Sequence, residues 1–456
     1  MSVLTDLPRM LKAEIRRHKV PGATLAVYRN GRVTEAAAGV INVDTAVSTT
    51  TDSVFQIGSI SKLFTGTLIM QLVDEGLVDL DAPIRSYLPE FTVLDGEASR
   101  TVTVRQLLCH SSGIEGDYFV NSGRGDESVA RLQDMGSLLP QLFPPGERMS
   151  YCNFGYAMLG RIIEVLTRES FDVAISKRIF GPLGMTHSLT LPEETVRFRT
   201  AIGHVPHPKK KGVNVQSPMP WLSIGQKAAG ATPSMSVGDL MKFVDMHLRR
   251  GRSRDGKRIL SARSVAAMQR RQIRLPRNAP RAAVGWGLSW ILCNWSNSRV
   301  IGHDGGTVGQ YSFLRILPKK KLAVALLTNG GDALGLYEAI FEQTFEKLGR
   351  VAQPSPPEPK PGLDVDPERL VGVYENLSGQ MEISYKRKRF KAEMRAREGM
   401  LTGQDLKPFT LEFADRNTAI VDAPDAPLHG QAILFDGNDL ARPDYVNLGF
   451  RLFRRR

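Results

Sequence analysis

The chain has 456 residues, more than a single hydrophobic core usually holds, so we expect two domains or one large domain with an appendage. Its 42% hydrophobic and 23% charged residues are ordinary for a soluble globular protein, and no apolar run is long enough to cross a bilayer. The net charge of +13 suggests nucleic-acid binding, but the basic runs are scattered and not interleaved with aromatic residues, so we expect no nucleic-acid partner.

The first predicted elements are a helix and a hairpin. Apolar residues recur with a helical period between residues 4 and 18. Two β-like runs, 23–28 and 33–36, flank Asn30-Gly31, a pair typical of a tight hairpin turn. Charged residues among the first ten positions do not fit a secretory signal. We therefore expect a cytoplasmic protein, or a periplasmic one if a signal was trimmed.

The long middle of the chain predicts a two-lobed α+β domain. Residues from about 60 to 280 are expected to be mostly helical. Strand-like runs return at 299–303, 311–317 and 322–327, and a helix follows from about 333 to 349. The simplest arrangement is one antiparallel sheet built from both ends of the domain, with the terminal helices packed on it and a helical second lobe. A site is expected in a cleft between the lobes.

A proline-rich stretch at 351–364 divides the chain and predicts a semi-rigid linker. Beyond it, residues 365–456 alternate short strand-like runs with turns, which is typical of a small all-β barrel. We therefore predict one domain at 1–350 and a second at 365–456.

The segment Ser59-Ile60-Ser61-Lys62 stands at the start of a long apolar, helix-forming run. Residues three apart share a helix face, with Cβ atoms roughly 5–6 Å apart, so Lys62 can reach the Ser59 hydroxyl. Such a hydroxyl is a weak nucleophile until a base takes its proton, and lysine can serve if burial or nearby positive charge keeps it partly neutral. Taken alone, the pair is better explained by a surface lysine at a helix start.

Two further motifs favour the catalytic interpretation. Tyr151-Cys152-Asn153 follows a turn-forming segment, and His303-Asp304-Gly305-Gly306 lies on a predicted strand. Glycines in a strand let the backbone approach a substrate closely.

With these three motifs, SxxK, YxN and HxG, the chain resembles the penicillin-recognising serine hydrolases. This superfamily includes class C β-lactamases, DD-carboxypeptidases, D-aminopeptidases and family VIII carboxylesterases. Segments 103–113, 230–234 and 285–288 are also similar to it, and the resemblance covers about residues 10–348. It implies a β-lactamase/transpeptidase-like fold. The C-terminal barrel resembles the lipocalin-like domains of some cytoplasmic relatives.

The resemblance also implies catalytic roles. Ser59 would be the nucleophile that forms an acyl-enzyme. Lys62 and Tyr151 would move protons, and which of them takes the first proton is open. Asn153 would hydrogen-bond the lysine and the substrate amide.

A second set of residues would bind the substrate. The N–H groups of Gly306 and Ser59 would form the oxyanion hole, next to Gly305. His303 replaces the lysine of the usual KTG motif, as in D-aminopeptidases and some DD-carboxypeptidases. A histidine there would be a weaker, pH-dependent anchor for a substrate carboxylate.

The favoured function is a D-aminopeptidase or DD-peptidase type of amidohydrolase, acting on small amides or peptides with D-residues. The alternatives are a carboxylesterase or weak β-lactamase, and a penicillin-binding sensor without turnover. No HExxH, P-loop or GxGxxG motif occurs, so we predict no metal and no cofactor. The expected partner is a small-molecule or short-peptide substrate, and the chain is compatible with a homo-oligomer. The barrel would either restrict the substrate or stabilise the protein.

Overall fold

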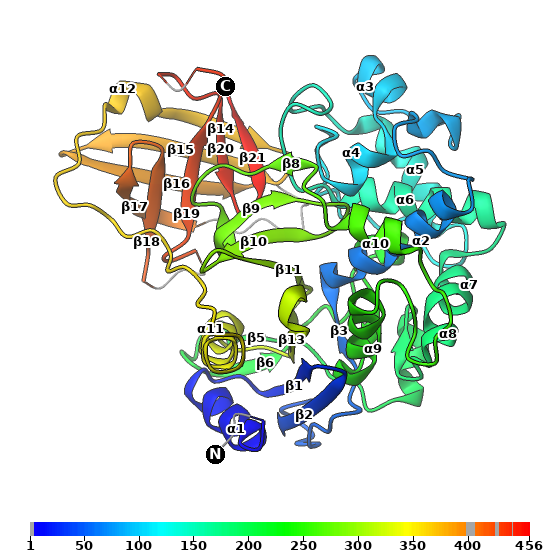
Figure 1. The fold of residues 1–456 in the computed structure, drawn as a ribbon. Coiled ribbons are helices and arrows are strands. Elements are labelled where there is room, and N and C mark those ends of the chain that lie inside the picture. The colour runs from blue at the N-terminus through cyan, green and yellow to red at the C-terminus, as the bar shows by residue number, and fades with distance from the viewer. Residues whose placement is uncertain (1–3, 398–405, 425–427, 440) are drawn as a thin grey trace.

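A computed structural model of the chain describes residues 4–397, 406–424, 428–439 and 441–456. A central sheet lies between a helical lobe and a closed barrel (Figure 1). Residues 1–3 fall outside the described part, and they belong to the N-terminal segment that was predicted not to be a secretory signal. Within that part, no helix combines the length and the apolar character needed to cross a membrane.

The central sheet has eight antiparallel strands in the order β2-β1-β13-β12-β11-β10-β9-β8. Asn30 and Gly31 join β1 to β2 with φ angles of 50° and 87°, as a primed turn requires. Because β1 pairs with β13, the predicted sheet built from both ends of the domain is confirmed. The strands are β1 Gly22–Arg29, β2 Arg32–Gly39, β8 Ile273–Arg274, β9 Ala283–Trp286, β10 Ile291–Trp295, β11 Ser298–Gly306, β12 Tyr311–Leu317 and β13 Leu322–Thr328.

Both faces of this sheet are covered by helices. Leu25 and Val27 of β1 join the core that includes α1 (Leu7–Arg17) and α11 (Ala333–Thr344). Ala26 and Tyr28 point to the other face, into the core that includes α9 (Val237–Leu248). Alternate strand residues face opposite sides, so nearly every residue of β1 is buried.

The helical lobe agrees with the prediction, but the sequence interpretation missed several strands. β8 lies at 273–274, inside the stretch expected to be mostly helical, and β9 and β10 lie at 283–295, where no strand was predicted. Short pairs also form between β3 and β7, β4 and β7, and β5 and β6. The remaining strands are β3 Phe55–Gln56, β4 Ser188–Leu189, β5 His204–Pro206, β6 Asn214–Gln216 and β7 Ser234–Met235. The helices are α2 Ser61–Asp74, α3 Gly96–Thr101, α4 Val104–Leu108, α5 Ser128–Met135, α6 Asn153–Thr167, α7 Phe171–Ile175, α8 Gly181–Leu183 and α10 Ala262–Met268.

The C-terminal part is a closed eight-stranded barrel, in which β14 pairs with both β15 and β21. The chain reaches it through residues 350–366, which form neither helix nor strand, and through the short helix α12 (Pro367–Leu370). The barrel was predicted, whereas the exact domain limits stay a prediction, and residues 398–405, 425–427 and 440 fall outside the described part. The strands are β14 Gly372–Asn376, β15 Gly379–Lys386, β16 Arg389–Ala396, β17 Leu406–Asp415, β18 Thr418–Asp422, β19 Ala432–Asp436, β20 Tyr445–Leu448 and β21 Arg451–Arg455.

Candidate active site

Ser59 lies in a single 3-10 turn that leads directly into α2. The backbone of this turn is tightly enclosed. Gly58 has a φ of 50°, and a Cβ atom at this position would lie only 2.5 Å from the backbone N of Gly306. A Cβ atom at Gly305 would come within 2.0 Å of the carbonyl oxygen of Ile57. Because these positions lack side chains, β11 can lie directly against the serine turn.

Lys62 reaches the serine from the first turn of α2. Its Nζ is 3.0 Å from Oγ of Ser59, 2.7 Å from Oδ1 of Asn153 and 2.5 Å from the carbonyl oxygen of Ala229. The side chain is fully buried, and none of these three partners is a carboxylate. Burial, followed by the positive charge of Arg451, lowers the pKa of Lys62 well below its usual value.

Tyr151 lies in the same buried cluster. The centre of its ring is 4.8 Å from Nζ of Lys62 and 5.0 Å from Cζ of Arg451, and His110 stacks on it with ring centroids 4.2 Å apart. Its buried hydroxyl makes no hydrogen bond of regular geometry with any described residue, although Ser59 is near enough to affect its pKa. Burial raises the pKa of Tyr151. The Ser59 hydroxyl and the positive charge of Arg451 both lower it, but by less than burial raises it. The phenol is therefore protonated at neutral pH.

Asn153 connects Lys62 to a carboxylate deeper in the site. As the first residue of α6, it accepts a hydrogen bond from Lys62 and donates one from Nδ2 to Oδ1 of Asp117 at 2.7 Å. Asp117 also accepts hydrogen bonds from Nε and Nη2 of Arg451. The amide therefore separates the lysine from the carboxylate, and Arg451 balances the charge of Asp117.

His303 is only 2% exposed on β11. Its Nδ1 is 2.6 Å from the backbone oxygen of Asp304, and its buried Nε2 has no partner in the described part of the chain. Burial, followed by the charge of Lys62, lowers the pKa of His303 to about 3. The sequence suggested a group that titrates near neutrality, but in this environment the imidazole is neutral at physiological pH.

The two oxyanion-hole candidates differ from the rest of the site in their access to solvent. Ser59 is partly exposed and Gly306 is exposed, whereas Lys62, Tyr151 and Asn153 are buried behind them. Ser59 and the end of β11 are therefore open to solvent, whereas the other three side chains are screened from it.

The turn between β20 and β21 of the barrel also reaches this site. A barrel that restricts the substrate was one of the two expectations for this domain, but the sequence analysis did not identify this turn. The carbonyl oxygen of Phe450 accepts a hydrogen bond from the backbone N of Tyr151 at 2.8 Å. The Phe450 ring lies edge-on to Trp286, with centroids 5.4 Å apart. Together with Arg451, this turn forms one wall of the site. Nothing in the local sequence marks it, because its neighbours come from distant parts of the chain.

The described residues contain no group of three or more His, Cys, Asp or Glu arranged to hold a metal ion. What the geometry does provide is a serine, a fully buried lysine with a lowered pKa, a tyrosine and a glycine-lined strand edge. These groups suit acyl transfer through a serine nucleophile.

Known proteins resemble this chain in sequence and in fold. The family model described as Beta-lactamase matches residues 7–346. The chain is 43% identical over 368 residues to "Penicillin-binding protein 4" of Amycolatopsis lactamdurans, which covers 79% of this chain and 95% of that protein. The structure of SurE with D-Leu aligns with a TM-score of 0.74 and 26% identity over 99% of both chains. D-amino acid amidase from Ochrobactrum anthropi with D-phenylalanine aligns with a TM-score of 0.62 and 24% identity, over 74% of this chain and 99% of that one.

The resemblance inferred from the three motifs is thus confirmed by matches that extend over most of the chain. The chain belongs to the beta-lactamase family, among the penicillin-recognising serine hydrolases.

Proposed function

We propose that the protein is a serine hydrolase that forms an acyl-enzyme on Ser59 with small amides or short peptides containing D-residues. The observation that carries this proposal is the 3.0 Å separation of Lys62 Nζ and Ser59 Oγ in a fully buried setting. A neutral lysine amine has two N–H donors and one lone pair. It can donate to Asn153 and Ala229 and use the lone pair to accept the serine proton.

Lys62, rather than Tyr151, is proposed as the first base. A general base works best when its pKa lies near the working pH. Burial moves the pKa of Lys62 down toward that range, and it moves the pKa of Tyr151 up and away from it. The Tyr151 hydroxyl would then donate its proton to the leaving-group nitrogen. The proton that Lys62 took from Ser59 would pass to Tyr151, so that both groups regain their starting protonation states before water hydrolyses the acyl-enzyme.

The tetrahedral intermediate would be stabilised by the backbone N–H groups of Ser59 and Gly306. The close approach of Gly58 to Gly306 supports this, because it keeps the serine turn against β11. One such donor typically contributes about 2.7–4 kcal/mol of transition-state stabilisation.

The choice of D-residue substrates rests on two kinds of support. The HxG motif resembles that of D-aminopeptidases, and structures of SurE with D-Leu and of a D-amino acid amidase share the fold. The turn at Phe450 and Arg451 lies beside Tyr151, which favours short substrates over a polymeric one.

Intact-protein mass spectrometry with parallel turnover assays tests the proposal. The panel comprises a β-lactam, a p-nitrophenyl ester, and the D- and L-alanine p-nitroanilides. We expect a mass adduct on Ser59, its loss in Ser59→Ala, and faster turnover of the D-anilide than of the L-anilide. An adduct that persists in Ser59→Ala would overturn the acyl-enzyme. Turnover of the ester alone would overturn the D-residue specificity.

A further inference from the structure

A cavity lies at the opposite end of α2 from Ser59, between α2, α4 and α10. Its volume is about 530 Å³, within the range of about 300–1,000 Å³ that is usual for small-molecule sites. Met70 and Val73 of α2, with Leu80, give it an apolar floor, and Ala267 of α10 covers it. Met70 is eight residues beyond Lys62, roughly 12 Å along the helix axis, so this cavity is distinct from the proposed active site.

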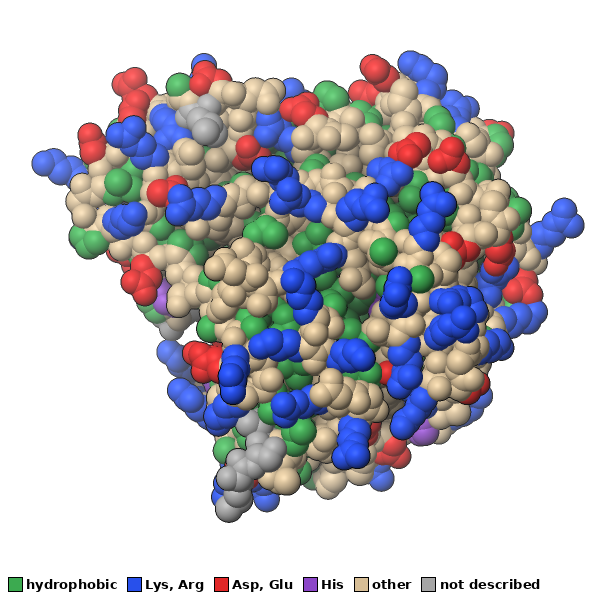
Figure 2. All heavy atoms as spheres, viewed as in Figure 1, with side chains coloured by type: hydrophobic (Ala, Val, Ile, Leu, Met, Phe, Trp, Pro, Cys, Tyr) green, Lys and Arg blue, Asp and Glu red, His purple; other side chains and the backbone are tan. Residues whose placement is uncertain are grey.

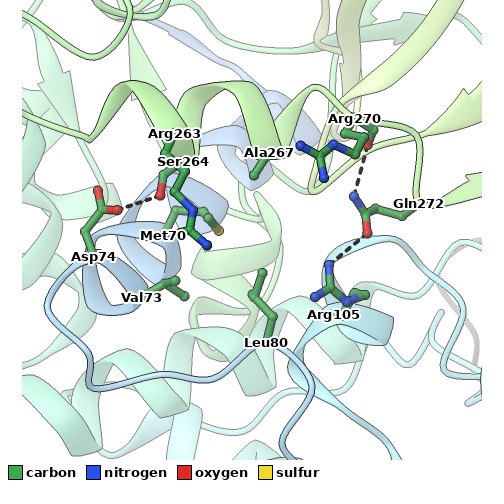
Figure 3. A pocket seen from close by; sticks show the side chains of 10 residues that line it. All are labelled: Met70, Val73, Asp74, Leu80, Arg105, Arg263, Ser264, Ala267, Arg270 and Gln272. Atoms are coloured by element: carbon green, nitrogen blue, oxygen red, sulfur yellow. Dashed lines mark hydrogen bonds between the residues drawn. The ribbon is translucent and has the colours of Figure 1, made fainter.

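Three arginines surround this floor (Figure 3). Arg105 makes two hydrogen bonds of 2.6 Å to the carboxylate of Asp81 and one of 2.9 Å to Gln272, so its charge is balanced. Arg263 and Arg270 are exposed at the rim. Across the described residues, neither has a side-chain hydrogen bond or a carboxylate partner.

Asp74 is the one carboxylate residue among those that line the cavity, and both of its oxygens accept hydrogen bonds from serines. Asp74 accepts hydrogen bonds from the backbone N and the hydroxyl of Ser261, each at 2.7 Å, and from the hydroxyl of Ser264 at 2.6 Å. It therefore anchors the start of α10, and it forms no ion pair with Arg263 or Arg270 among the described residues. The surrounding face carries many Lys and Arg side chains near its centre, with hydrophobic atoms exposed between them (Figure 2).

We propose that this cavity binds an amphipathic anion, with a carboxylate or phosphate head at Arg263 and Arg270 and a short hydrocarbon tail over Met70, Val73 and Leu80. A guanidinium presents paired N–H groups that match both kinds of head. Burial of a tail on the apolar floor adds a favourable contribution that a free ion lacks. A cationic head would be repelled by the arginines.

Isothermal titration calorimetry on the full chain tests the site with octanoate, octyl phosphate, octylamine and octanol, all below their micelle concentrations. Acetate and inorganic phosphate supply the heads without a tail. We expect both octyl anions to bind at least about tenfold more tightly than the tailless ions or the other octyl compounds. The head that binds more tightly identifies which class of natural ligand the site prefers.

The variant Arg263→Gln/Arg270→Gln should weaken binding of the octyl anions by at least about tenfold. Because both arginines are exposed, its unfolding midpoint should match that of the parent protein. Arg16→Gln/Arg100→Gln, which alters two exposed arginines outside the cavity, is the matched control and should bind as the parent does. The proposal is overturned if neither octyl anion binds, if octylamine binds equally well, or if the cavity variant binds as tightly as the control.

Discussion

Two lysines in the described part of the chain, Lys62 and Lys227, are fully buried, and they differ in their hydrogen-bond partners. Lys227 donates to the carboxylate of Asp172 on α7, so its charge has a counter-charge. Among the described residues, Lys62 donates hydrogen bonds to a hydroxyl, an amide side chain and a backbone carbonyl, and it has no carboxylate partner. A buried cation is tolerated when it is paired, and otherwise it loses its proton easily. The two lysines thus differ in their partner rather than in their depth of burial, and this difference is why Lys62 is the one proposed as a base.

The largest effect is expected for Lys62→Met, which tests whether Lys62 is the base for Ser59. If Lys62 is the base for Ser59, kcat/KM for the D-alanine p-nitroanilide should fall by about 10²–10⁴-fold. Stability to urea should be unchanged or higher, because a buried amine has been removed. Ser61→Ala, a buried hydroxyl on the same helix turn, is the matched control and should keep its activity. Near-normal acylation in the methionine variant would assign the base elsewhere.

The same substitution at Lys227 should lower stability, whereas at Lys62 it should lower activity. Lys227→Met leaves the carboxylate of Asp172 without its cation, which should lower the free energy of unfolding by about 3–5 kcal/mol. Urea denaturation measures this loss. Adding Asp172→Asn to Lys227→Met should recover part of it, because both charges are then gone. An unchanged midpoint for Lys227→Met would show that the ion pair contributes nothing to stability.

Glu115 extends the comparison to a buried carboxylate without a cation in contact. It accepts a hydrogen bond from the backbone N of Leu377 in the turn between β14 and β15. Burial raises the pKa of Glu115 to about 7. Because the folded pKa lies above the unfolded one, this group's contribution to stability is present at low pH and is lost as pH rises through about 7.

Glu115→Gln should therefore be more stable than the parent at pH 8, by about 2–3 kcal/mol, and nearly equal to it at pH 4.5. Urea midpoints at the two pH values measure the difference. Glu147→Gln, which alters a less buried carboxylate, serves as the control. A stability difference that is the same at both pH values would contradict the raised pKa.

The smallest expected effect concerns Arg451. Its positive charge lowers the pKa of Lys62, while Asp117 raises it. Arg451→Gln removes the cation and leaves Asp117 unbalanced, so the pKa of Lys62 should rise. If Lys62 is the base proposed above, activity requires its neutral form, and the acidic limb of kcat/KM should move to higher pH by about one unit.

The pH profile separates this effect from a general loss of packing, which would lower the rate without moving the limb. Arg456→Gln, which breaks a barrel ion pair with Glu375, is the matched control and should leave the profile unchanged. An unmoved limb in Arg451→Gln would mean that the barrel does not tune Lys62.

Much of the fold could be predicted from short-range patterns. The hairpin at Asn30-Gly31, the three strands near 299–328 and the barrel all carry local signals of turn residues and alternation. The strands β9 and β10 were missed because polar and apolar residues alternate only weakly along them. Trp286 and Trp295 are both fully buried, and four of the five residues of β10 are buried, so the segment shows little polar alternation.

The residues of the candidate site could be predicted where they lie close together on the same helix start or the same strand. Ser59 and Lys62 lie about one helical turn apart, and His303 and Gly305 share a strand. Arg451 could not be foreseen, because it lies 334 positions from its partner Asp117. The neutral state of His303 was equally hidden, since it depends on burial that only the folded chain creates. The specific roles of these residues, and a homo-oligomeric state, stay predictions.

The contact between Tyr151 and Phe450 also bears on how the protein is made. Ribosomes synthesise Ser59, Lys62 and Tyr151 long before they reach the turn at Phe450 and Arg451. Until that turn has left the exit tunnel, the backbone N of Tyr151 lacks its acceptor and Asp117 lacks its cation. A nascent chain can therefore bury its lysine early, yet the environment that lowers the pKa of that lysine is completed only after residue 451 has left the tunnel.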